Sequence, residues 1–193
     1  MRRGGTWVQR WRVPLGFACA GVFLLLAAPR PATLLAGGLV ALAGLAIRAW
    51  SSGHIRKNDA LAVSGPYAYT RNPLYFGSLL IGLGFTVAAA GRWWLLPVLG
   101  GVFAALFFGI YLSVMRVEAA TLRQLFGEDY ERYARNVPLL LPRLTPYHDD
   151  GRGARLKFDA GLYMRYREYR AALGLLAAWG LLALKPFLLR WIF

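Results

Sequence analysis

Five long apolar runs constrain this chain more than any other feature. They cover residues 13–29, 31–47, 73–91, 93–115 and 171–193, and the expected spanning helices have the same bounds except that the second extends to residue 50. A helix needs about 20 mostly apolar residues to cross the hydrocarbon core of a bilayer. The runs therefore predict an all-α polytopic membrane protein with about five transmembrane helices and cytosolic amphipathic helices. The first run follows several Arg residues and ends in small residues, so it is also compatible with a signal peptide.

The composition supports the membrane interpretation. The 193 residues are 58% apolar, 15% aromatic and 17% charged, whereas soluble domains average about 45–50% apolar and about 25% charged. This balance excludes a disordered chain and a disulfide scaffold, and it disfavours a soluble enzyme. The single cysteine, Cys19, cannot form an internal disulfide. We expect one integral-membrane domain over residues 1–193.

The charge distribution predicts an orientation. The chain has 23 Lys and Arg residues against nine Asp and Glu, for a net charge of +14. With the N-terminus in the cytoplasm, 19 of the 23 basic residues fall on the cytoplasmic side, as the positive-inside rule requires. We expect a bacterial or archaeal plasma membrane, a site facing the cytoplasm, and contact with membrane lipids rather than nucleic acid.

The long polar segment over residues 116–170 carries its own pattern. Apolar residues from Leu122 to Val137 recur at helical spacing, with Gly127 as a possible break. Three prolines that follow forbid a regular helix. Residues 147–156 resemble a linker, residues 157–170 predict an interfacial helix, and the final transmembrane helix completes residues 147–193.

One candidate site lies just before the third apolar run. The stretch over residues 64–77 combines Tyr67, Arg71, Asn72 and Tyr75 with Pro73, which suits the first turn of a helix. Unpaired backbone N–H groups at such a helix start can hold an anionic group. An aromatic belt with a snorkelling Arg is the alternative interpretation.

A second candidate is Glu118, three residues after the fourth apolar run. A carboxylate at that depth is costly without a partner. Its alternative role is a surface ion pair with Arg116 or Arg123. The chain has two histidines, His54 and His148, and no zinc-ligand cluster, so no metal site is expected.

Together these stretches resemble the integral-membrane isoprenylcysteine carboxyl methyltransferase and phospholipid N-methyltransferase superfamily, over about residues 35–145. The matching residues are Gly65, Tyr67, Arg71, Asn72, Pro73, Tyr75, Gly77, Glu118, Phe126, Gly127, Tyr130 and Tyr133. Two positions depart from the family pattern. Asn72 stands where that pattern has histidine, and Ala119 stands where it has a second glutamate.

The resemblance implies S-adenosylmethionine as methyl donor and a lipid-like small molecule as acceptor, either a prenylcysteine-type carboxylate or a phospholipid-type amine. The implied donor-binding residues are Gly65, Tyr67, Arg71, Asn72, Pro73, Tyr75 and Glu118. Arg71 would take the donor's carboxylate, Glu118 its ammonium, and Tyr67 or Tyr75 its sulfonium or adenine. His54 and Glu118 are the candidate catalytic residues, as bases for an amine acceptor. The alternatives for His54 are that it lines the site or lies at the surface.

Two other function classes stay open at this point, and the oligomeric state is left open too. A nicotinamide-dependent membrane reductase of related architecture would need a larger, more anionic cofactor. A non-catalytic membrane scaffold or a transporter is the third class, although transporters usually place polar residues near the bilayer midplane.

Overall fold

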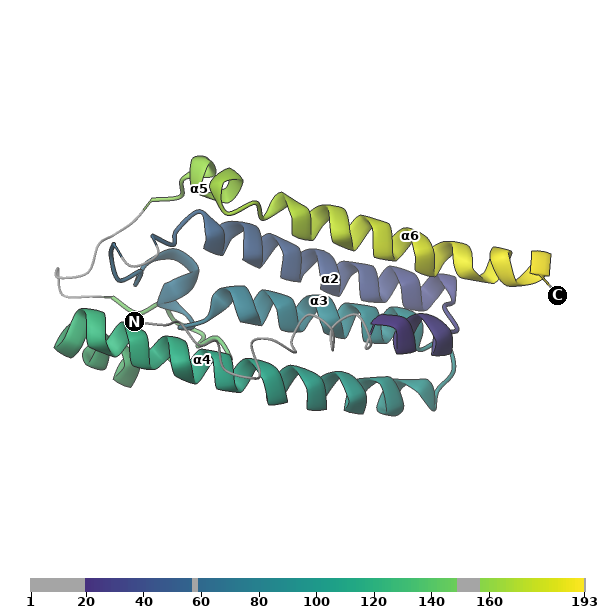
Figure 1. The fold of residues 1–193 in the computed structure, drawn as a ribbon, viewed down its shortest axis with the longest axis horizontal. Coiled ribbons are helices and arrows are strands. Elements are labelled where there is room, and N and C mark those ends of the chain that lie inside the picture. Colours follow the sequence, from purple (N-terminus) through teal and green to yellow (C-terminus); the bar gives the residue numbers. More distant parts are fainter. Residues whose placement is uncertain (1–19, 57–58, 149–156, 193) are drawn as a thin grey trace, which may run out of the picture. The chain divides into compact units, whose positions relative to one another are not determined.

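The computed structural model describes residues 20–56, 59–148 and 157–192. Residues 20–26 are helical. They are followed by α2 (Pro31–Ser52), the short 3₁₀ helix η1 (Gly65–Ala68), α3 (Pro73–Ala89), α4 (Leu95–Asn136), α5 (Ala160–Arg165) and α6 (Tyr169–Ile192) (Figure 1). The predicted all-α class is confirmed for the described part of the chain, which contains no strand.

Within the described residues, three helices are long and apolar enough to cross a membrane. They are α2, α4 and residues Tyr169–Phe187 of α6. The predicted third span, α3, is apolar but has only 17 residues. Residues 13–19 of the first predicted span, Cys19 among them, lie outside the described residues. α2 begins at Pro31, where a missing N–H costs a helix nothing.

The fourth predicted span continues into the amphipathic stretch after it, and α4 joins two helical segments across a kink at Gly127. α4 has 42 residues and continues well past the predicted end at residue 115. Its geometry is broken only at Gly127, with φ 51° and ψ −124°, which is the position predicted as a break. α4 ends at Asn136, two residues before Pro138, because a proline cannot continue the helical hydrogen bonding.

The predicted interfacial helix over residues 157–170 is shorter than expected. α5 has six residues, and the Asp159 carboxylate caps it by accepting from the Gly161 N–H at 2.7 Å. Arg167 then adopts a left-handed conformation with φ 56°, which ends regular helix before α6 begins at Tyr169. Of the predicted linker, residues 149–156 lie outside the described residues.

The chain divides into two compact units. The first contains Met1–Leu42, Ile81–Val114 and Leu175–Phe193, and the second contains Ala43–Leu80 and Met115–Gly174. The prediction of one membrane domain stays a prediction. The motif residues from Gly65 to Tyr75, and Glu118, all belong to the second unit.

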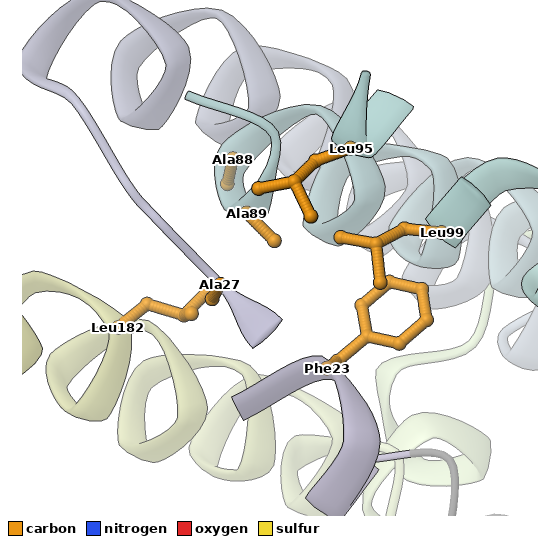
Figure 2. Close-up of a cluster of buried hydrophobic side chains, with 7 residues drawn as sticks. All are labelled: Phe23, Ala27, Ala88, Ala89, Leu95, Leu99 and Leu182. Atoms are coloured by element: carbon orange, nitrogen blue, oxygen red, sulfur yellow. The ribbon is translucent and has the colours of Figure 1, made fainter. Parts of the chain in front are cut away.

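An apolar cluster forms the core of the first unit. Figure 2 shows the ring of Phe23 beside Leu99 and the side chain of Leu182 directed toward Ala27. The other members are Ala88, Ala89 and Leu95. Small residues keep this packing tight, because a Cβ on Gly84 would lie 2.5 Å from the carbonyl oxygen of Gly37.

Lys185 caps the C-terminal end of the helix over residues 20–26. The Lys185 ammonium donates to the carbonyl oxygens of Leu24 at 2.6 Å, Leu25 at 2.8 Å and Ala27 at 2.5 Å. The last carbonyls of a helix have no partner within it. Lys185 therefore satisfies carbonyls that would otherwise face an apolar environment unpaired.

The second unit has a smaller core of its own. Val63 packs with Tyr130, Tyr133 and Val137, all of them buried. Tyr130 and Tyr133 belong to α4 and Val137 directly follows it, and the three have the helical spacing seen in the sequence. That stripe therefore covers the segment leading into η1.

Candidate functional site

The loop before α3 is held in place by the extended chain after α4. The N–H of Arg71 donates to the carbonyl oxygen of Pro138 at 2.9 Å, and the N–H of Arg143 donates to that of Tyr69 at 2.9 Å. Because its prolines cannot continue a helix, this chain segment leaves its carbonyls available for such bonds.

Side chains reinforce the same junction. The Thr70 hydroxyl donates to the Leu140 carbonyl at 2.9 Å, and the Asn72 side-chain amide donates to the Leu139 carbonyl at 2.9 Å. The Tyr133 hydroxyl donates to the carbonyl oxygen of Tyr67 at 2.7 Å. Every step of the loop from Tyr67 to Asn72 therefore has a defined position.

Gly65 begins η1 in a conformation that requires glycine. Its φ is +60°, and a Cβ there would lie 2.7 Å from both Cδ2 and Nε2 of His54. Left-handed backbone costs most residues about 1–2 kcal/mol. The Gly65 of the motif is thus explained by the turn and by the close approach of His54.

His54 is buried beneath this turn. Its Nδ1 lies 2.9 Å from the carbonyl oxygen of Trp50, and its ring packs against Phe158 at a centroid distance of 6.0 Å. A carbonyl only accepts, so Nδ1 carries the proton and Nε2 faces Gly65. The structure gives His54 a packing role, and its catalytic role stays a prediction.

A cavity of about 220 Å³ lies between the loop before α3 and the α4 residues of the second unit. The polar and charged residues in its lining are Arg56, Tyr67, Arg71, Asn72, Glu118, Thr121, Tyr130 and Tyr133. Four predicted site residues are therefore brought together: Tyr67, Arg71, Asn72 and Glu118. His54, Gly65, Pro73 and Tyr75 are not among the described residues that line it.

Two hydrogen-bond donors in this lining are buried without a partner. The Tyr67 hydroxyl and the Arg71 Nε have no hydrogen-bond partner among the described residues. Burial raises the pKa of Tyr67 far above its usual range, and the Glu118 and Glu168 carboxylates raise it further. The hydroxyl therefore stays protonated as a donor. Buried donors without partners are costly, so both fit a ligand that carries acceptor atoms.

Glu118 is exposed on α4 and has a defined partner. Its Oε1 accepts a hydrogen bond from the Tyr75 hydroxyl at 2.8 Å. Arg123, one of the two ion-pair partners considered from the sequence, pairs with Glu131 instead. Tyr75 thus reaches the site by holding Glu118 rather than by lining the cavity.

The expectation that the N–H groups at the start of α3 hold an anion stays a prediction, and two of these groups are bonded within the chain. The carbonyl oxygen of Asn72 accepts from the N–H of Tyr75 at 3.1 Å and from that of Phe76 at 3.0 Å. Pro73 has no N–H to offer. Of the side-chain donors in the cavity lining, the Tyr67 hydroxyl and the Arg71 Nε are buried without a partner among the described residues, so both can bind an anion.

Two residues that matched the family pattern were not assigned to the site from the sequence. Tyr130 and Tyr133 line the cavity, and Arg71 Nη1 donates to the Tyr130 hydroxyl at 3.4 Å. The spacing of these two tyrosines after Phe126 and Gly127 in the family pattern was the feature of the sequence that could have assigned them to the site. Among the described residues, no group of three or more His, Cys, Asp or Glu side chains could hold a metal ion.

Comparisons with known proteins bear on this site. A cobalt-zinc-cadmium resistance protein, CzcN, of Cupriavidus metallidurans is 36% identical over 107 residues. A nickel-cobalt-cadmium resistance protein, NccN, of Alcaligenes xylosoxydans xylosoxydans is 31% identical over 107 residues. Each match covers 53% of this chain and 46% of the relative, so the chain spans about half the length of these relatives. No solved structure matches significantly.

A family model for phospholipid methyltransferases matches residues 32–129, about half of the chain. The match includes Gly65, Tyr67, Arg71, Asn72, Pro73, Tyr75 and Glu118, and the resemblance inferred from the sequence is confirmed. With three helices able to span a bilayer, the match supports an integral-membrane methyltransferase in general. The chain belongs to the phospholipid methyltransferase family.

Proposed function

We propose that this protein transfers a methyl group from S-adenosylmethionine to a lipid-like acceptor at the cytoplasmic face of the membrane. The observation that carries the proposal is the pair of buried, unpartnered donors in one cavity, the Tyr67 hydroxyl and the Arg71 Nε. Glu118 contributes a carboxylate to the same lining.

These groups fit the polar parts of the donor. A carboxylate would accept from the Tyr67 hydroxyl and from the guanidinium of Arg71, which is well suited to carboxylates. An ammonium would pair with Glu118. The faces of Tyr67 and Tyr130 offer π-electron density to a sulfonium. The lining thus offers an opposite charge to the donor's carboxylate and to its ammonium, and aromatic faces to its sulfonium.

The chain needs little covalent chemistry for such a reaction. S-adenosylmethionine, when bound, supplies a methyl group already activated on sulfur. The protein's part is to align the acceptor and exclude water. A carboxylate acceptor needs no base, whereas an amine acceptor must lose a proton. Glu118, exposed at the cavity, is better placed for that proton than His54, which lies outside the lining.

The membrane context favours an amphiphilic acceptor. Three helices have the length and apolar character of spans, and the basic residues are concentrated in the polar segments that also hold the site. We infer that the water-soluble donor arrives from the cytoplasm and the acceptor enters from the bilayer. Both would meet at the membrane surface, near the start of α3 and Glu118.

The test is methyl transfer by the purified full chain in lipid nanodiscs. The protein is incubated with the methyl-labelled donor and total membrane lipid, and labelled products are identified by mass spectrometry. A labelled lipid that is lost with Glu118→Ala and retained with Glu128→Gln, an exposed carboxylate elsewhere on α4, supports the proposal. Absence of both donor binding and labelling contradicts it, and binding of a nicotinamide dinucleotide instead would favour a reductase.

A second assay addresses the acceptor. The kcat/KM for a labelled amphiphile is compared with that of its tail-less, water-soluble analogue. Entry from the bilayer predicts a much lower value for the analogue. Equal values would mean that the apolar helices only anchor the protein.

A further inference from the structure

Arg48 lies at the centre of a polar cluster in the second unit. Its Nη2 donates to Glu168 Oε2 at 2.7 Å and Oε1 at 3.0 Å. Its Nη1 donates to the Ser78 hydroxyl at 2.6 Å and the Leu74 carbonyl at 3.3 Å. The side chains of Arg48 and Glu168 are only 21% and 14% exposed. A charge on a helix as apolar as α2 needs such a partner.

A position with special requirements lies on each side of the ion pair, one steric and one in the backbone. A Cβ on Gly77 would lie 2.6 Å from Cγ of Arg48, so only glycine lets the Arg48 stem pass α3 at this point. On the other side, Arg167 holds a left-handed φ of 56° directly before Glu168. Strained non-glycine residues concentrate where the surrounding structure holds them for a purpose.

The cluster holds the part of α3 that carries Tyr75. Leu74 and Ser78, the two α3 partners of Arg48, lie on either side of Tyr75 in the first two turns. Tyr75 in turn holds Glu118 through its hydroxyl. Glu168 also acts directly on the cavity, because its negative charge helps to raise the pKa of Tyr67. A continuous set of contacts therefore runs from Glu168 to the lining of the cavity.

We infer that Glu168, clamped by Arg48, is a positioning residue of the proposed methyl-transfer site. The inference rests on the proposed function. It brings the corner between α5 and α6, which lies outside the residues matched by the family model, into the functional unit. Loss of the Glu168 charge frees Arg48, loosens the first turns of α3 and shifts Tyr75 and Glu118. Misplacement by about 1 Å can reduce a rate about 100-fold even when binding survives.

The test compares two carboxylate-to-amide changes in the full chain in nanodiscs. Glu168→Gln removes the charge of the buried pair, and Glu131→Gln does the same to the exposed Arg123–Glu131 pair, whose side chains are 59% and 41% exposed. For Glu168→Gln we expect faster amide hydrogen exchange over residues 75–79 and a kcat lowered about tenfold or more, because alignment rather than binding is lost. The donor Kd should rise by a smaller factor than kcat falls, because Glu118 is displaced but keeps its charge. Glu131→Gln should match the unchanged protein in all three measurements.

A double variant separates positioning from folding. Arg48→Met with Glu168→Met replaces the pair by apolar side chains, a change that proteins often tolerate without loss of stability. We expect an unchanged melting temperature with fast exchange at the start of α3 and a low kcat. Wild-type exchange and wild-type kcat in this variant, or in Glu168→Gln, would overturn the inference.

Failure of the proposed function gives a different result. If the unchanged protein neither binds the donor nor labels any lipid, the proposed function is wrong, and the catalytic part of the inference falls with it. The exchange measurement still decides the positioning part, since it needs no turnover. Exchange over residues 75–79 that is unaffected by Glu168→Gln overturns that part as well.

Discussion

Removing the buried hydroxyl of Tyr67 should stabilise the protein, whereas most substitutions of buried residues destabilise it. Tyr67 is 6% exposed, and its hydroxyl has no hydrogen-bond partner among the described residues. Tyr67→Phe keeps the ring and removes only that group. A buried donor left unsatisfied costs about 1–3 kcal/mol. We therefore expect the variant without ligand to gain about 1–2 kcal/mol in its free energy of unfolding, the lower part of that range.

Tyr133→Phe is the matched control. It also removes one buried phenolic oxygen, but this hydroxyl donates to the Tyr67 carbonyl at 2.7 Å. Its loss leaves that buried carbonyl unpaired, so the free energy of unfolding should fall by about 1–3 kcal/mol. Each variant removes one phenolic hydroxyl from the lining of the same cavity, yet the two should move stability in opposite directions.

The assay is thermal unfolding followed by circular dichroism in one detergent, first without ligand and then with the methyl donor. Tyr67→Phe should melt higher than the unchanged protein when empty. It should also bind the donor about tenfold more weakly by calorimetry, which corresponds to about 1.4 kcal/mol for a lost hydrogen bond. If both variants melt lower to a similar degree, the Tyr67 hydroxyl has a structural partner and the reasoning is refuted. An unchanged donor Kd would remove Tyr67 from the binding groups.

The remaining predictions concern the carboxylate, the turn and the topology. Glu118→Ala should weaken donor binding by about 1.5–3 kcal/mol if a charge-assisted hydrogen bond is lost, and unchanged calorimetric affinity would leave Glu118 a structural role. Gly65→Ala should lower the melting temperature by forcing a Cβ into His54 at positive φ, whereas Gly109→Ala, which meets no atom within 4 Å, should leave it equal or higher. Cysteines introduced at positions 55 and 92 should label from opposite sides of the membrane, and labelling from one side would reject the predicted orientation.

Local signals were enough for the main elements of the fold. The break before Pro31 and the distortion at Gly127 were both expected from residue type, because proline and glycine restrict or free the backbone wherever they stand. The extent of α4 was not expected. Its apolar span and its amphipathic stripe have different patterns, yet both are helical, and nothing local separates them before Gly127.

The sequence predicted which residues belong to the site better than it predicted the contacts that they make. The motif spacing predicted Tyr67, Arg71, Asn72 and Glu118 as one group, and they line one cavity. The motif spacing did not show that the Asn72 side-chain amide would donate its hydrogen bond to the Leu139 carbonyl. Nor did it separate His54 from this group, because a lone histidine in a polar segment has no pattern that reveals what will cover it.

The sequence by itself determined that this is a helical membrane chain of the methyltransferase type, since apolar run length and motif spacing are properties of residues near one another. The tertiary structure alone decided which side chains meet. Tyr75 holds Glu118 across 43 residues, and Arg48 holds Glu168 across 120 residues. The free energy of such contacts comes from burial and pairing after the chain has folded, so no local pattern encodes them. The same packing leaves the Tyr67 hydroxyl and the Arg71 Nε in the cavity without a hydrogen-bond partner among the described residues.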